Sequence, residues 1–258
     1  MTRALVQRPA AHKGAGHRSL GDALVGYHDR SMMPLTVLVL LLPLIIVYEV
    51  GTALMAADPA GNPEMRVLAF SLFRHFMEMF GATGRYLPAM AVVAILLTWH
   101  IARRDPWQPH VGTAMLMAVE SALLAFPLLA IGNLLGHYLP LADGIALRGG
   151  MVLAIGAGIY EELVFRLIGF TVLNIVLGDL LRVRKAAAVT LIIVITSVMF
   201  AAYHHLSPYS PPFRWSDAIF RTAAGVYFAA LFLCRGFGIT AAVHIAYDFY
   251  YFLIRGAV

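Results

Sequence analysis

Two adjacent carboxylates and a guanidinium stand inside an otherwise apolar stretch of this chain. They are Glu161, Glu162 and Arg166, in the segment "GAGIYEELVFRLIGF" at residues 156–170. A charged residue at the centre of a membrane-spanning helix costs roughly 2.5 to 3.5 kcal/mol on insertion scales. Because such a cost argues against chance, we interpret these residues as functional.

Spacing along a helix gives the two glutamates different surroundings. Glu162 and Arg166 are four residues apart, so they share one helical face and can neutralise each other in a poor solvent. Glu161 points about a quarter turn away and lacks such a partner in its own helix. The pattern predicts a structural ion pair beside a carboxylate that is free for chemistry.

Two later apolar segments carry polar residues at the same four-residue spacing. "FAAYHH" places Phe200 and His204 on one face, where the ring can shield the imidazole, and this spacing favours His204 over the adjacent His205. "HIAYD" places Asp248 where it can accept a hydrogen bond from one nitrogen of His244 and fix the tautomer of the ring. Two more helices therefore each offer a histidine.

A carboxylate without its own cation, opposite histidines from two other helices, can activate a water molecule. Glu161 would take the proton, while His204 and His244 would polarise the water or stabilise the developing oxyanion. The same three side chains could instead hold a zinc ion as a three-ligand catalytic site. Tyrosines flank the motif residues and could add a hydroxyl beside them; they are Tyr160, Tyr203 and Tyr247.

The composition indicates where this chemistry takes place. Apolar residues make up 60% of the 258 residues and charged residues only 13%, which excludes an ordinary soluble domain. A span needs roughly 20 residues, so we predict an all-α, polytopic membrane helix bundle with about seven transmembrane helices. The net charge of +5 comes from basic residues in short loops, which are topology signals and do not indicate nucleic-acid binding.

The apolar runs locate these elements. Spans are predicted at about 34–56, 87–102, 112–135, 149–177, 187–205, 217–234 and 238–255. Between the first two, residues 65–80 place their polar side chains largely on one side of a helix and phenylalanine and leucine on the other. This pattern predicts an amphipathic helix that lies in the membrane interface.

Basic residues also suggest how the chain is organised across the membrane. Residues 1–31 read as a basic, loosely ordered cytosolic tail without a signal peptide, and residues 32–258 as a single transmembrane domain. A cytosolic amino terminus collects most loop lysines and arginines on the cytosolic side, which predicts a carboxyl terminus outside. Loops 100–111 and 178–186 would then face the cytosol.

In order along the chain, the three motifs resemble those of a known family. "EELVFR" matches E-E-x-x-x-R, "FAAYH" matches F-x-x-x-H and "HIAYD" matches H-x-x-x-N/D. The chain resembles, over roughly residues 110–255, the CPBP-family intramembrane proteases, which include CAAX prenyl endopeptidases and bacterial Abi proteins. The resemblance implies a helical bundle with an intramembrane cavity and glutamate-dependent peptide hydrolysis, with no metal or other cofactor.

The resemblance also implies a role for each matched residue. Glu161 would be the base, His204 would hold the water, and His244 with Asp248 would form the oxyanion side. An ionised aspartate cannot donate a hydrogen bond as asparagine can, so Asp248 would stay protonated or only orient His244. The supporting residues would be Glu162, Arg166 and Phe200.

These observations define the expected setting and leave two other functions open. We expect an integral protein of a bacterial inner membrane whose partners are the bilayer and a membrane-anchored or hydrophobic peptide, with no nucleic acid. The sequence has no H-E-x-x-H, G-x-S-G or G-x-G-D motif of other intramembrane proteases. The polar residues could instead serve as the relay of a proton-coupled transporter, or belong to a non-catalytic protein that binds a membrane peptide.

Overall fold

Helices form all the regular structure in the part of the chain that the computed structural model describes, residues 20–56, 66–135, 147–206 and 212–255. No strand occurs in these ranges, which confirms the all-α prediction. The elements are α1 (Leu20–Ser31), α2 (Pro34–Ala56), α3 (Leu68–Glu78), α4 (Leu87–Arg103), α5 (Val111–Leu124), α6 (Phe126–Leu134), α7 (Leu147–Glu162), η1 (Leu163–Ile168), α8 (Gly169–Asn174), η2 (Ile175–Leu180), α9 (Lys185–Tyr203) and α10 (Trp215–Arg255).

Several of these helices are long and apolar enough to cross a membrane. Among the described residues they are Pro34–Ala56, Val111–Leu134, Gly149–Leu180, Lys185–Tyr203 and Trp215–Ile254. Helix α4 is apolar but has only 17 residues. The prediction of about seven spans agrees approximately, because Trp215–Ile254 contains both of the last two predicted spans.

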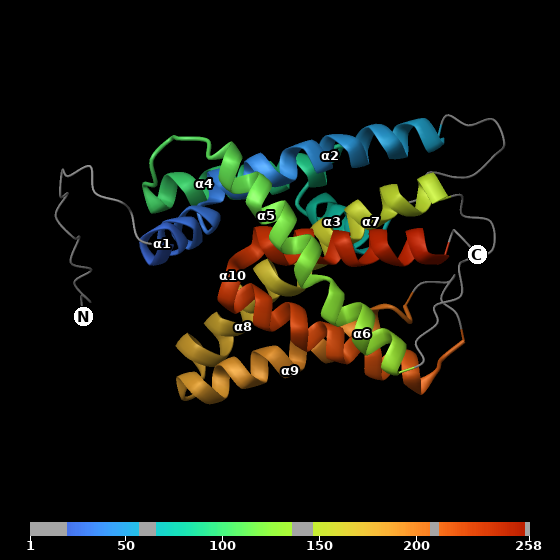
Figure 1. Ribbon diagram of the computed structural model, residues 1–258. Helices are drawn as coiled ribbons and strands as arrows, with labels where there is room; N and C mark the ends of the chain where they lie inside the picture. The colour runs from blue at the N-terminus through green and yellow to red at the C-terminus, as the bar shows by residue number, and fades with distance from the viewer. Residues whose placement is uncertain (1–19, 57–65, 136–146, 207–211, 256–258) are drawn as a thin grey trace, which may run out of the picture.

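A single residue joins those last two spans. Gly236 has φ 74° and ψ −179°, which are not helical values, so α10 consists of two helical segments that meet at a sharp kink, as the red ribbon in Figure 1 shows. A positive φ favours glycine, which has no Cβ to clash with the backbone. Gly236 therefore lies within the predicted boundary between residues 234 and 238 and separates two helical segments, as the sequence predicted.

Helix α10 is the centre of the bundle. Its most extensive contacts are with α7 and α9, and α5 crosses beside it (Figure 1). The side chains in the core are almost fully buried and come from distant parts of the chain; examples are Leu41, Met117, Ile159, Phe228 and Phe237. This packing brings together the three helices that carry the sequence motifs.

The helix that continues from α7 changes from α-helix to π-helix at the charged motif. Residues Leu163–Ile168 (η1) and Ile175–Leu180 (η2) form π-helix, with α8 between them. Short π-helical segments inside α-helices are frequent at functional sites. Here the first one begins directly after Glu162 and contains Arg166.

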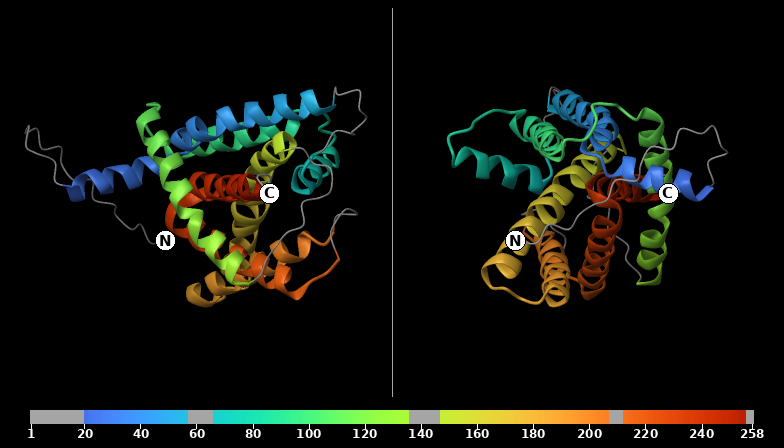
Figure 2. Two further views of the ribbon diagram at one scale, coloured as in Figure 1. Left: turned by 45° about the vertical axis from the view of Figure 1, so that its right-hand side comes forward. Right: turned by 90° about the vertical axis from the view of Figure 1, so that its left-hand side faces the viewer.

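Helix α3 is amphipathic, as predicted for residues 65–80. Ala69, Phe70 and Phe73 are buried, whereas the exposed side carries the polar His75 and Glu78 together with Leu72 and Phe76. Its 11 residues extend only about 16 Å, too short to span a hydrocarbon core. Figure 2 shows α3, in teal, at the side of the bundle near α7.

The amino-terminal segment differs in part from its prediction. Residues 20–31, expected to be loosely ordered, form helix α1, which contacts α5, α10 and α2. This contact is made by polar side chains; Arg30, for example, donates a hydrogen bond from Nε to Thr113 at 3.3 Å. The rest of the predicted tail, residues 1–19, lies outside the described residues.

Connections alternate between the two ends of the bundle. In Figure 1, α1, the α4–α5 connection and the end of η2 lie at one end, while α2 and α10 finish at the other. This alternation agrees with the predicted order of the loops. The assignment of either end to the cytosol stays a prediction.

Candidate active site

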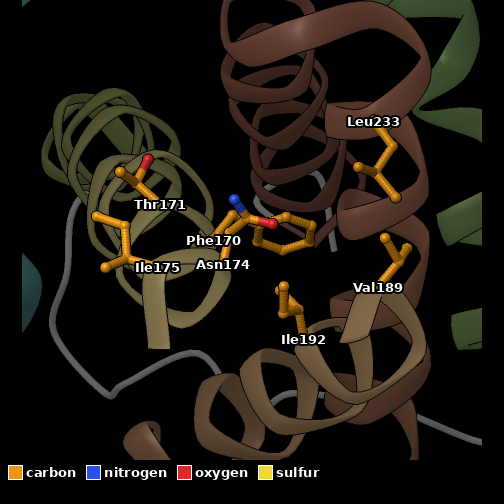
Figure 3. Close-up of a pocket in the computed structure, with 7 residues that line it drawn as sticks. All are labelled: Phe170, Thr171, Asn174, Ile175, Val189, Ile192 and Leu233. Carbon is orange, nitrogen blue, oxygen red and sulfur yellow. The ribbon is translucent and has the colours of Figure 1, made fainter. Parts of the chain in front are cut away.

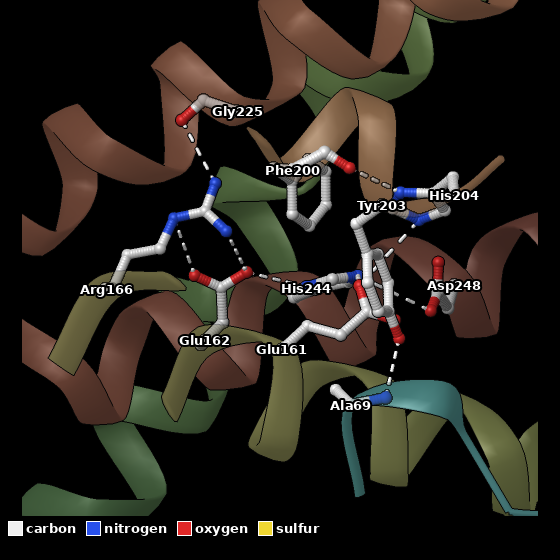
Figure 4. A network of polar contacts seen from close by, with 10 residues as sticks. All are labelled: Ala69, Glu161, Glu162, Arg166, Phe200, Tyr203, His204, Gly225, His244 and Asp248. Carbon is white, nitrogen blue, oxygen red and sulfur yellow. Dashed lines mark hydrogen bonds and ion pairs between the residues drawn. The ribbon is translucent and has the colours of Figure 1, made fainter. Parts of the chain in front are cut away.

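The three sequence motifs meet at one place inside the bundle (Figure 4). The glutamate pair ends α7, the first histidine directly follows α9, and the second histidine lies in the half of α10 after the kink. The predicted site residues that Figure 4 shows together are Glu161, Glu162, Arg166, Phe200, His204, His244 and Asp248.

Glu161 faces two histidines from other helices. Its Oε2 lies 3.8 Å from Nε2 of His204 and 3.9 Å from Nε2 of His244. The residue is 5% exposed, and no lysine or arginine in the described ranges forms an ion pair with it. These separations are too long for direct hydrogen bonds and short enough for a water molecule to bridge Oε2 of Glu161 and an imidazole nitrogen.

The predicted pair of Glu162 and Arg166 is present and fully buried. Arg166 Nε lies 3.2 Å from one carboxylate oxygen of Glu162, and Nη1 donates to the other at 3.2 Å. Nη2 of the same guanidinium donates to the carbonyl oxygen of Gly225 at 3.1 Å. The guanidinium carbon also lies 4.5 Å and 5.4 Å from the ring centres of Phe200 and Phe228. The cation is thus held by three helical segments.

The hydrogen-bond partner of His244 differs from the prediction. Nδ1 of His244 lies 2.8 Å from Oε1 of Glu162, whereas Oδ2 of Asp248 is 3.7 Å from Nε2, beyond hydrogen-bond distance. The expectation that Asp248 fixes the tautomer is therefore wrong, because a closer carboxylate reaches the ring from α7. The ring of Phe228 stacks on His244, with centroids 4.7 Å apart.

His204 is held by the backbone of its own helix. Its Nδ1 lies 2.8 Å from the carbonyl oxygen of Phe200, and the two rings meet edge to face at 4.8 Å. A carbonyl only accepts, so Nδ1 carries a proton, and Nε2 of the neutral ring is the acceptor that faces Glu161. The adjacent His205 instead lies against Phe213, with ring centroids 5.1 Å apart.

One of the flanking tyrosines enters the site. The hydroxyl of Tyr203 donates to Oε1 of Glu161 at 3.3 Å and accepts from the backbone N–H of Ala69 at 2.7 Å. Tyr160 lies in a separate buried aromatic cluster with Tyr48 and Phe70. The sequence indicated a hydroxyl beside the motifs, but it gave no sign that α3 reaches the site.

A groove elsewhere in the bundle lacks such chemistry. It has a volume of about 320 Å³ and lies between α8, η2, α9 and α10 (Figure 3). Its lining contains neither a motif residue nor a titratable side chain; the residues are Phe170, Thr171, Asn174, Ile175, Val189, Ile192 and Leu233. This groove therefore offers no side chain that could activate a water molecule, in contrast to the Glu161 cluster.

Metal binding was the alternative use of the three central side chains. Within the described ranges, no group of three or more histidine, cysteine, aspartate or glutamate side chains is arranged to hold a metal ion. Metal independence of the reaction stays a prediction, and a test of it is given in the Discussion.

Known proteins provide an independent view of this region. Residues 144–250 match the family model described as type II CAAX prenyl endopeptidase Rce1-like. No curated protein and no solved structure gives a match to the chain. The matched region contains all three motifs, so the resemblance to the CPBP and CAAX protease family is confirmed for this part of the chain.

Proposed function

Because residues 144–250 match the Rce1-like CAAX endopeptidase family model, we propose that this membrane protein is an intramembrane endopeptidase of the glutamic type. It hydrolyses a peptide bond in a membrane-associated protein or a hydrophobic peptide. Glu161 is the general base in this proposal. His204 holds the attacking water, and His244 stabilises the oxyanion.

The observation that carries the proposal is the position of Glu161. It is buried, has no cation of its own in the described part of the chain, and directs one oxygen at imidazole nitrogens 3.8 and 3.9 Å away. A carboxylate needed only for structure would be expected to be paired, as Glu162 is with Arg166.

The tautomer of His204 defines how a water molecule is held. Nε2 of His204 and Oε2 of Glu161 both accept hydrogen bonds, so a water between them donates one hydrogen to each. Both lone pairs of the water oxygen stay free, and one of them attacks the peptide carbonyl carbon. The two acceptors thus orient the nucleophile as well as activate it.

In the proposed reaction, Glu161 accepts a proton in the first step and returns it in the second. As the water oxygen bonds to the carbonyl carbon, its proton moves to Glu161 and the carbonyl oxygen becomes an oxyanion. When the carbon–nitrogen bond breaks, Glu161 returns this proton to the departing amine. The products are a carboxylic acid and an amine, and the base is restored.

His244 lies where it can stabilise the oxyanion. Its Nδ1 donates to Glu162, so Nε2 donates to an oxyanion only when the ring carries both protons. The carboxylate of Glu162 lies 2.8 Å from Nδ1 of the ring and compensates for that positive charge. Asp248 adds a second donor only in its protonated form.

Comparative proteomics of membranes tests the proposed function. Cells that make wild-type protein are compared with cells that make Glu161→Gln, and Asp179→Asn on the exposed end of η2 serves as a control for carboxylate loss. We expect uncut precursors to accumulate with Glu161→Gln only. Identical peptide termini in all three membranes would contradict the proposal.

A further inference from the structure

A tyrosine hydroxyl connects helix α3 to the proposed base. Tyr203 is 6% exposed, and its hydroxyl lies between the backbone N–H of Ala69, at 2.7 Å, and Oε1 of Glu161, at 3.3 Å (Figure 4). The three groups come from α9, α3 and α7. An element from the amino-terminal third of the chain thus reaches the motif residues.

The direction of these hydrogen bonds follows from the chemistry of the donors. A backbone N–H can only donate, so the Tyr203 oxygen accepts from Ala69. The single phenolic proton is then available for Glu161, whose carboxylate offers Oε1 as the acceptor. Contact at Oε1 fixes the plane of the carboxyl group and leaves Oε2 directed at the histidines, 3.8 and 3.9 Å away.

The ring of Tyr203 is held by packing on both sides of the site. Its centroid lies 5.2 Å from that of Phe165 and 5.1 Å from that of His204, both edge to face. These contacts limit rotation of the ring and keep the hydroxyl beside Glu161. Tyr203 therefore supplies a pre-positioned donor and does not have to be ordered during the reaction.

Helix α3 supplies its donor at no cost to its own structure. Ala69 lies in the first turn, where backbone N–H groups have no acceptor within the helix. The start of α3 is anchored because Arg66 pairs with Glu49 at 2.9 Å and lies 4.3 Å from the ring of Phe70. Phe70 in turn meets the ring of Tyr160, next to Glu161, at 5.0 Å.

We propose that Tyr203 is a positioning residue for Glu161, and that docked α3 completes the active site by holding the Tyr203 hydroxyl. The inference rests on the proposed role of Glu161 as the base. It adds that Tyr203 acts through the carboxyl group and does not touch the reacting atoms. It also makes α3, which lies outside the matched region, a functional part of the enzyme.

Infrared spectroscopy on purified protein tests the hydroxyl directly. The difference between wild type and Glu161→Gln isolates the carboxyl band of Glu161, and we expect that band to shift in Tyr203→Phe. The matched control is Tyr227→Phe, which removes a hydroxyl that donates to the Leu124 carbonyl at 2.7 Å, away from the site. An unchanged Glu161 band in Tyr203→Phe would overturn the proposal.

Kinetics distinguish positioning from a structural role. With a quenched-fluorescent peptide that contains the cleavage site of a precursor found in the proteomic comparison, kcat of Tyr203→Phe should fall about 10- to 100-fold, the effect of losing one hydrogen bond to a charged group. KM should stay close to the wild-type value, because the substrate contacts are unchanged. A raised KM with normal kcat would assign Tyr203 to substrate binding and contradict the proposal.

The part played by α3 is tested by a double-mutant cycle. Ala69→Pro removes the backbone donor in the first turn of the helix, where a proline is best tolerated. If this N–H acts through Tyr203, Ala69→Pro lowers kcat in the wild-type background and adds little in Tyr203→Phe. Additive losses would show that α3 does not act through the hydroxyl.

The two hypotheses fail in different ways. If purified wild-type protein does not cleave the precursors found in cells, the proposed function is wrong, whatever the infrared bands show. If wild type cleaves and Glu161→Gln does not, but Tyr203→Phe matches wild type in band and kcat, only the positioning role is wrong.

Discussion

Two carboxylate–guanidinium pairs in this bundle show how similar groups serve different purposes. At one end, Arg235 next to the α10 kink donates from Nε and Nη2 to the two oxygens of Glu120, at 2.8 and 2.7 Å. Tyr27 of α1 donates to the same carboxylate. This is a short, two-pronged pair between partly exposed side chains, and it joins α1, α5 and α10.

The second pair, Glu162 with Arg166, is longer and fully buried. Both of its contacts measure 3.2 Å, and Glu162 shares one of its oxygens with His244. The next carboxylate along the helix, Glu161, faces histidines instead of a cation. In the first cluster the charges of Glu120 and Arg235 pair with each other. The second cluster contains an additional carboxylate, Glu161, that is available for proton transfer.

This comparison of the two clusters suggests that Glu162 and Arg166 have a structural role, whereas the adjacent Glu161 has a chemical one. In a low-dielectric bundle a lone carboxylate is costly, and Glu162 with Arg166 supplies a neutral frame in which Glu161 can be kept. The Glu120 pair has no such neighbour and lies beside the kink at Gly236. We therefore expect substitutions in the two clusters to separate activity from stability.

The largest effect is expected from loss of the proposed base. Glu161→Gln should lower turnover by roughly 10²- to 10⁴-fold, the usual contribution of a general base. The melting temperature in detergent should hardly change, because no lysine or arginine in the described ranges forms an ion pair with Glu161. Turnover of a fluorogenic peptide and melting are measured on the same sample. An active Glu161→Gln would remove the difference between the clusters.

Glu162→Gln should primarily destabilise the protein. It leaves the buried Arg166 without its carboxylate and replaces the charged acceptor of His244 with a weaker amide oxygen, at a cost of about 3 to 5 kcal/mol for breaking a buried pair. Thermal melting in detergent should show a large decrease, shared by Arg166→Gln. A stable but inactive Glu162→Gln would exchange the roles of the two glutamates.

A smaller loss of stability should follow at the other pair. Glu120→Gln keeps the shape of the side chain but weakens charged hydrogen bonds to Arg235 and Tyr27, by about 1 to 3 kcal/mol. Partial exposure lets water compensate, so the loss should be smaller than for Glu162→Gln. Peptide cleavage by the folded fraction should match wild type. A selective loss of turnover would show that the two clusters are coupled.

Asp248→Asn should have a slight effect. Glu162 already orients His244, so Asp248 is needed only as a neutral donor on the oxyanion side, a role that asparagine fills. We expect kcat to stay within about a factor of 10 of wild type. Asp248→Ala, the control without a donor, should fall further. Equal losses in both variants would mean that the negative charge of Asp248 is required.

Chelation should have no effect on cleavage. A glutamate base with histidines at 3.8 and 3.9 Å activates water without a Lewis acid in the proposed mechanism. Elemental analysis and peptide turnover before and after a chelator check this. One zinc per chain, lost together with activity, would make Glu161, His204 and His244 metal ligands.

The contacts that could be predicted from the sequence are those within one helix. Four-residue spacing predicted the pair of Glu162 with Arg166 and the contact of Phe200 with His204, and both are present. Spacing works here because residues four apart share a helical face whatever surrounds the helix. The apolar runs likewise located the spans approximately, including two that the structure joins at Gly236.

Contacts between helices could not be predicted in the same way. Glu162 reaches His244 across 82 residues, and Tyr203 reaches Ala69 across 134. These partners depend on the rotation and depth of each helix, which a single sequence does not specify. The Asp248 prediction failed for that reason, since it considered only the nearest carboxylate along the chain.

Cleavage of a defined peptide by purified protein in sealed vesicles tests the central claim most directly. The substrate is a precursor identified in the proteomic comparison, and mass spectrometry follows both fragments. The account predicts two products whose masses sum to the substrate plus one water, formed by wild type and not by Glu161→Gln. Intact peptide that accumulates inside the vesicles, or stays bound and uncut, would contradict it and favour a transporter or a binding protein.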